Sequence, residues 1–167
     1  MTNNFRPFLD AEITARAFER VRSALEEMLR NAFAGRAGFA VVVSGLQELV
    51  PVKPDAQFRE NCLLVTSIGD LSKSPYPNME IALSKAEISV RTRMPSSRVP
   101  QHFLRAGDTV YSGSAILDGI IVACAGLEPR DDEMISYWIA AAIKSEVAGV
   151  VAQRMAANPS ADFFSEA

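Results

Sequence analysis

The chain has 167 residues, of which 49% are hydrophobic, and a formal net charge of −3. This length suffices for one domain that buries roughly 70% of its unfolded surface, so neither a disulfide nor a metal is needed to hold it together. The acidic balance argues against a general nucleic-acid-binding protein, which needs a concentrated basic surface. The one locally basic segment, residues 91–105, is interpreted as a solvated face.

The cysteines and the first residues bear on the compartment. Cys62 and Cys124 lie in apolar segments without metal-ligand spacing, which is typical of buried thiols in a reducing compartment. Residues 1–7 lack the basic-then-apolar pattern of a secretory signal. No apolar run approaches the ~20 residues that cross a bilayer. We therefore expect a cytoplasmic protein with no membrane or nucleic-acid partner.

The first predicted element is an amphipathic helix that begins after Asp10, a good N-cap residue. Apolar residues recur in it at steps of three and four as far as Ala32. Gly35 and Gly38 follow, and glycine can end a helix in a left-handed conformation.

Two buried strands are predicted after this helix, over residues 39–43 and 62–68, where β-branched and apolar residues dominate. The segment 45–60 between them is compatible with a strand or a helical turn. Pro51 and Pro54 interrupt any regular element there.

A second helix is predicted from Asn78 until Pro95 stops it. Lys85 and three other charged residues are expected to project away from its apolar face. Residues 96–106 are expected to be irregular, with a short turn around 100–104. The apolar face comprises Met79, Ala82, Leu83, Ala86 and Val90.

The most informative stretch is a predicted β-hairpin that leads directly into a helix. Residues 110–117 are predicted to point alternately to the two faces of a strand, and Asp118-Gly119 favours a type I′ turn because both central residues need positive φ. Residues 120–126 are continuously apolar, so we expect both faces of this return strand to be covered.

The last helix is predicted to run to about Ala157. Asp131, Asp132 and Glu133 at its start form either a carboxylate cluster for metal or acid–base chemistry or, the favoured interpretation, an acidic first turn that complements the helix dipole. Glu146, near the apolar stripe, is interpreted as an interface or cleft residue. The stripe comprises Ile135, Trp138, Ile139, Ala142, Ile143, Val150 and Val151.

The order of helix, strands, helix, hairpin and helix predicts an α+β fold. We expect a single domain over residues 1–167, with its core at about 10–157 and loose termini. Its antiparallel sheet should have about five strands with helices packed on it.

Two motifs resemble the GlcG/HbpS family, which includes haem-binding proteins and the C-terminal domain of PduO-type proteins. The segment Asn78–Ala86 resembles the family helix Ile-Asp-Ile-Ala-Ile-Asp-Lys-Ala. Residues 113–133 resemble the family's Gly-rich hairpin, small-residue return strand and acidic helix start. The resemblance covers roughly residues 12–148 and implies profilin-like layering and a small-molecule or haem-binding module. Three loops depart from the family pattern and would line any ligand cleft: 44–61, 112–115 and 126–129.

His102, the single histidine, is the candidate metal and cofactor ligand. A neutral imidazole is a common ligand of haem iron, and Phe103 and Leu104 would supply an apolar wall for a porphyrin. The alternative is a loop histidine without a ligand. If His102 is not the ligand, the side chains to consider are Tyr76, Tyr111 and Met94.

Lys85 matches the lysine of the family helix and is the second candidate cofactor-binding residue. It would pair with a substrate carboxylate or a haem propionate; alternatively, its stem covers apolar surface while the amine stays in water. No phosphate-binding loop, zinc-protease motif or serine elbow appears, so no catalytic residue is assigned.

The apolar content predicts a homo-oligomer, because three helices can each hide only one apolar stripe. Val147, Val150 and Val151 span a wide arc of the last helix, and Phe163-Phe164 add an apolar tip to the tail. Two functions are therefore carried forward. The first is a non-catalytic small-molecule or haem-binding module, and the second is an oligomeric scaffold or accessory subunit without a ligand of its own.

Overall fold

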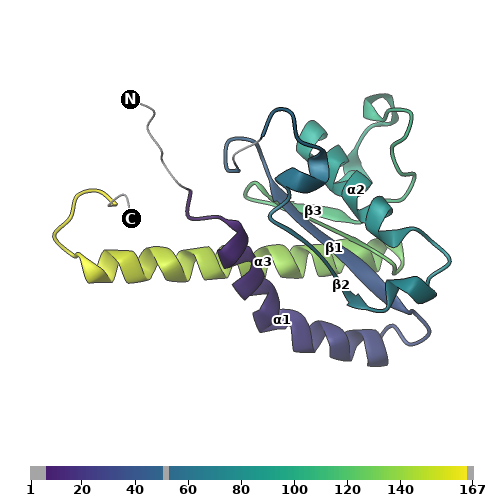
Figure 1. The fold of residues 1–167 in the computed structure, drawn as a ribbon, viewed down its shortest axis with the longest axis horizontal. Helices are drawn as coiled ribbons and strands as arrows, with labels where there is room; N and C mark the ends of the chain where they lie inside the picture. The colour runs from purple at the N-terminus through teal and green to yellow at the C-terminus, as the bar shows by residue number, and fades with distance from the viewer. Residues whose placement is uncertain (1–6, 51–52, 165–167) are drawn as a thin grey trace.

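Four strands form one antiparallel sheet in the computed structural model, in the order β2-β1-β4-β3 (Figure 1). The structure describes residues 7–50 and 53–164. The strands are β1 (Gly38–Gly45), β2 (Leu64–Gly69), β3 (Ser114–Leu117) and β4 (Ile120–Ala125).

Three α-helices cover the sheet from both sides: α1 (Ala11–Asn31), α2 (Asn78–Thr92) and α3 (Pro129–Ala157). The cores on the two faces show that α1 and α3 pack on one face and α2 packs on the other (Figure 1). The fold is therefore a single-domain α+β structure in three layers, and the predicted fold class is confirmed.

The two central strands divide their side chains between these layers. In β1, Phe39 and Val41 belong to the core with α1 and α3, whereas Ala40 and Val42 belong to the core with α2. Every residue of β1 and of β4 is buried, so the prediction that both faces of the return strand are covered is confirmed.

Local signals placed two boundaries correctly. Asp10 caps α1 by accepting a hydrogen bond from the Ile13 backbone N–H at 2.8 Å. Asp118 and Gly119, with φ of 49° and 86°, form the tight turn between β3 and β4. The C-cap residue of α1 is Ala32, which has a right-handed conformation. The predicted left-handed end at a glycine is therefore wrong, because Gly35 takes its positive φ of 94° only after the helix has ended.

The sheet has four strands where about five were expected, and β3 is shorter than the strand predicted over 110–117. The Leu46–Val50 segment is a turn in which the backbone N–H groups of Leu49 and Val50 both donate to the Leu46 carbonyl. Gly113, with φ of 135°, stops β3 from extending toward residue 110.

The helix α3 is 29 residues long and continues well past the sheet (Figure 1, yellow end). Ile135, Ile139 and Ile143 are fully buried, but from Ala148 onward the helix is mostly exposed. Trp138 was placed on the buried stripe, yet half of it is exposed. Among the described residues, α3 is the one helix that is long and apolar enough to cross a membrane. This differs from the expectation that no apolar segment of the chain reaches the length needed to cross a bilayer. One of its faces nevertheless lies in the protein core.

Candidate functional site

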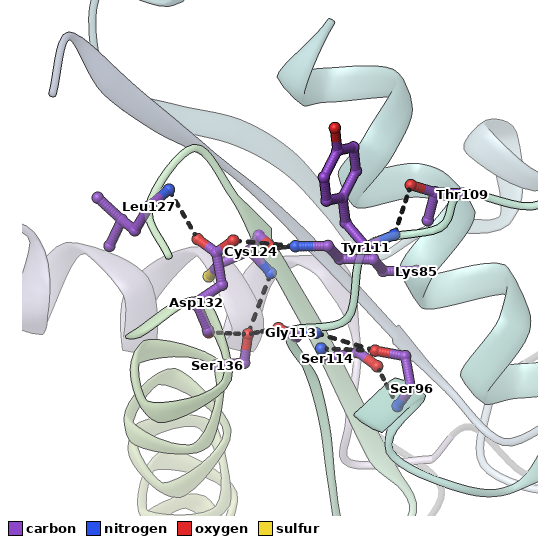
Figure 2. A network of polar contacts seen from close by, with 10 residues as sticks. All are labelled: Lys85, Ser96, Thr109, Tyr111, Gly113, Ser114, Cys124, Leu127, Asp132 and Ser136. Atoms are coloured by element: carbon purple, nitrogen blue, oxygen red, sulfur yellow. Dashed lines mark hydrogen bonds and ion pairs between the residues drawn. The ribbon is translucent and has the colours of Figure 1, made fainter. Parts of the chain in front are cut away.

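The strand β3 begins only at Ser114, so the edge of β4 beyond that point has no neighbouring strand on this side. The β3–β4 pairing begins at Ser114 and Ala123, so the last two residues of β4 have no β3 partner. Side chains from two helices take that place (Figure 2). Lys85 Nζ donates to the Cys124 carbonyl at 2.8 Å, and Ser136 Oγ accepts from the Cys124 N–H at 3.0 Å.

Lys85 and Asp132 form a buried ion pair at this gap, with 2.9 Å between Nζ and Oδ2 (Figure 2). Their side chains are only 1% and 3% exposed. Lys85 comes from α2 and Asp132 from α3, so the pair joins the two outer layers past the sheet. The second carboxylate oxygen of Asp132 accepts from the Leu127 N–H at 3.1 Å. Buried charges persist only with such partners.

The ionisation of Asp132 depends on Lys85. Burial raises the pKa of the Asp132 carboxyl, because the charged form loses its hydration. The Lys85 ammonium and the hydrogen bond from Leu127 oppose this rise. Removing the ammonium would therefore raise the pKa of the Asp132 carboxyl further.

Gly113 makes room for the ion pair. A Cβ atom at this position would lie 2.6 Å from Asp132 Cβ and 2.9 Å from Lys85 Nζ. The loop is held in place by Ser96, whose Oγ accepts from the N–H groups of Gly113 and Ser114 at 3.0 and 3.1 Å (Figure 2).

A cavity of about 280 Å³ lies against this pair. Two tyrosines line it and border its opening, since Tyr76 and Tyr111 are 54% and 45% exposed. Their rings meet edge to face, with centroids 6.4 Å apart and planes at 74°. The full lining comprises Arg36, Tyr76, Asn78, Ile81, Lys85, Tyr111, Ala125, Gly126, Leu127, Glu128, Pro129 and Asp132.

The charges that line the cavity are balanced. Arg36 forms an ion pair with Glu128, and Lys85 forms one with Asp132. The lining therefore offers a ligand hydrogen-bonding groups and aromatic surface, but no net charge.

The structure brings Lys85 into the cavity wall and corrects its predicted orientation. Lys85 was expected to project away from the packed face of α2, but it lies on that face with Ala82, Ala86 and Ser89, all buried. The positional signal was present, because these residues recur at helical spacing. The sequence-based interpretation nevertheless placed Lys85 on the exposed side, because a charged side chain is seldom buried.

Asp132 has two roles, one of which the sequence indicated. The helix begins at Pro129 with Glu128 as its N-cap residue, and Asp132 accepts from the Leu127 N–H just before it. An acidic residue does therefore serve the helix start. Its ion pair with Lys85 was not expected, and neither was the assembly of Arg36, Tyr76 and Tyr111 around it.

His102 is not part of this cavity lining. It lies exposed in a short 3₁₀ helix, Gln101–Phe103, with its ring edge-on to Phe103 at 4.6 Å between centroids. The two predicted cofactor-binding residues thus occupy separate places. Within residues 7–50 and 53–164, no three His, Cys, Asp or Glu side chains are grouped to hold a metal ion.

The cysteine thiols are not activated. Burial raises the pKa of Cys124 and of Cys62 to about 12 in each case. Cys124 is buried, as the sequence predicted, whereas Cys62 was also expected to be buried but is only partly so. Neither offers a thiolate nucleophile at neutral pH.

Comparisons with known proteins give this chain no family. No protein-family model matches it, and no curated protein matches it. A solved structure that it resembles is the crystal structure of Ybr137w protein, with a TM-score of 0.49 and 13% sequence identity over 80% of this chain and 76% of that one. A likeness at this level carries no argument about function.

Proposed function

We propose that this protein is a non-catalytic module that binds a small molecule in the cavity between α2 and the start of α3. The observation that carries the proposal is the buried Lys85–Asp132 pair in the wall of a cavity bordered by two half-exposed tyrosines. Binding sites combine apolar and aromatic walls with a few fixed polar groups, and this cavity has both.

The chemistry of the lining favours an uncharged aromatic ligand with a carbonyl group. Tyr76 and Tyr111 provide ring surface at the opening. The Lys85 ammonium has three N–H donors, of which two bond to Cys124 and Asp132, so one remains for a ligand oxygen. The internal pairing of all four charged side chains disfavours a charged ligand.

Saturation-transfer NMR with benzamide tests this proposal, using a variant that fills the cavity. Ile81 lines the cavity and is half-buried, so Ile81→Trp should occupy the space and abolish saturation transfer. Glu80→Trp, at an exposed position of the same helix turn, is the matched control and should behave like wild type. Absence of transfer to benzamide in wild type, or equal transfer in all three proteins, contradicts the proposal.

Haem is the second candidate ligand, with His102 as its axial ligand. The observation that favours it is apolar surface beside this histidine, since Phe103 and Leu104 are 42% and 41% exposed. Because His102 lies outside the cavity, haem bound through it would rest on this surface. Haemin titration should give a saturable Soret band in wild type and a weaker or shifted one in His102→Ala. Identical spectra and midpoints exclude His102 and direct attention to Tyr76, Tyr111 and Met94.

A further inference from the structure

Between Met134 and Ala157, the face of α3 that points away from the protein core carries no charged residue except Lys144, which lies at its border. A helix on the surface of a globular protein normally places charged residues opposite its core face. Here the core face holds isoleucines, and the outer face is apolar or small. Its exposed members recur at alternating steps of three and four: Trp138, Ala141, Ser145, Ala148, Ala152 and Met155.

The last third of α3 also extends beyond the sheet (Figure 1). On its inner side, Arg154 lies over the Phe8 ring at 5.2 Å, and Phe8 meets Phe164 edge to face. Its outer side is exposed, with Met155 at 59%. Isolated helices shorter than ~12–15 residues are marginal in water, so such an extension gains from a partner on its bare side.

The outer face is complementary to itself when two copies run antiparallel. With the two-fold axis between residues 146 and 147, Trp138 faces Met155 of the second copy. Ala141 then faces Ala152, and Ser145 faces Ala148. Large side chains meet at the two ends, where sulfur–aromatic contact is favourable. Small side chains meet at the centre, where the backbones can approach closely. The three–four spacing is the one that coiled-coil seams use.

We propose that two copies of this chain associate through this antiparallel α3–α3 seam. The surface is separate from the cavity and goes beyond the proposed ligand-binding function. A closed two-fold pair is the commonest arrangement of identical subunits, and it requires the self-complementary surface described above.

The charged residues that border the seam do not oppose this pairing. Lys144 is in an ion pair with Asp118 of its own chain. Glu146 bonds to Arg16 and Arg20 of α1 at 3.1 and 2.7 Å, so this residue joins two helices of one copy. Neither side chain brings an unpaired charge to the interface.

A second copy fits the observations better than a lipid bilayer. The inner face of α3 is packed on the sheet through Ile135, Ile139 and Ile143, so the helix cannot enter a membrane without unfolding the core. The symmetric order of side-chain sizes along the seam has no counterpart in a lipid surface.

Light scattering after size exclusion tests the pairing. Wild type at tens of micromolar should have twice the chain mass of 18.1 kDa. Ser145→Glu should halve the measured mass, because it places a carboxylate at the centre of the seam. Adding Ala148→Lys should restore the doubled mass, since each new lysine then faces a new glutamate of the other copy. Ala24→Glu, at an exposed position of α1, should leave the mass unchanged.

Disulfide trapping tests the orientation. In the antiparallel register, an oxidised mixture of Ala141→Cys and Ala152→Cys chains should give a covalent dimer. Each variant alone should give none beyond the wild-type background, because its two equivalent cysteines lie about 16 Å apart along the axis, too far for a disulfide.

Three results overturn the proposal: a monomeric wild type, a Ser145→Glu variant that keeps the doubled mass, or cross-linking that favours the single variants over the mixture. Flotation of a monomeric wild type with phosphatidylcholine–phosphatidylglycerol vesicles would assign the face to lipid and overturn it as well.

Discussion

Replacing Lys85 by methionine tests whether the buried ion pair stabilises the fold. Methionine keeps the length and much of the apolar stem but removes the ammonium, leaving the Asp132 side chain at 3% exposure without its cation. Breaking a buried pair by removing one partner costs about 3–5 kcal/mol. In a domain of this size each 1 kcal/mol shifts the melting temperature by about 2–4 °C, so a fall of about 6–20 °C is expected.

The same variant should acquire a distinctive pH dependence. Burial raises the pKa of Asp132, and in Lys85→Met no ammonium opposes that rise. A carboxyl with a raised folded-state pKa contributes stability below its unfolded pKa and loses that contribution as pH rises through the folded value. The stability deficit of Lys85→Met relative to wild type should therefore be small near pH 4, about the pKa of an aspartate in the unfolded chain, and grow as the pH rises above it.

Urea and thermal unfolding followed by circular dichroism provide the measurement, with two matched variants. Lys144→Met removes the exposed partner of Asp118 and should cost about 0–1 kcal/mol. Lys85→Met/Asp132→Leu leaves no lone charge and should recover most of the lost stability. A Lys85→Met protein as stable as wild type at pH 8, or one whose deficit does not change with pH, would refute the reasoning.

Two further predictions concern the hairpin and the thiols. Gly119→Val should lower the free energy of unfolding by about 1–3 kcal/mol, because valine strains a positive φ; at this position φ is 86° and a Cβ atom would lie 2.4 Å from Leu49. An unchanged melting temperature would contradict the turn assignment. In the native protein at pH 8, Cys124 and Cys62 should react with Ellman's reagent far more slowly than in urea, because burial raises both thiol pKa values to about 12. Fast labelling of native Cys124 would contradict its burial.

The sequence predicts the elements whose causes are local. Asp10 caps a helix because its side chain reaches a backbone N–H three residues on. Asp118-Gly119 turns the chain because these residues tolerate positive φ. The apolar runs of β1 and β4 predict buried strands, and the unbroken run of β4 also predicts that both of its faces are covered.

The cavity could not be predicted in this way, because it depends on the residue at which β3 begins. Lys85 and Asp132 are 47 residues apart in sequence and meet only because β3 leaves the end of β4 unpaired. Taken singly, a lysine on a helix suggests a surface position, and an acidic residue at a helix start suggests capping. Their pairing needs the tertiary arrangement that places α2 and α3 on opposite faces of the sheet.

The helix α3 shows why an apolar pattern alone does not identify the buried face. Its sequence contains two apolar seams, and Trp138 was assigned to the core seam although it belongs to the outer one, where it is half exposed. The isoleucine seam packs on the sheet because branched side chains fill the space between layers. The alanine-rich seam leaves the backbone open to close approach. Apart from Asp132, whose charge is paired with Lys85, neither seam contains a charged residue. Each of these two sides of the helix is therefore suited to a dry neighbour, and within one chain the sheet supplies only one of the two.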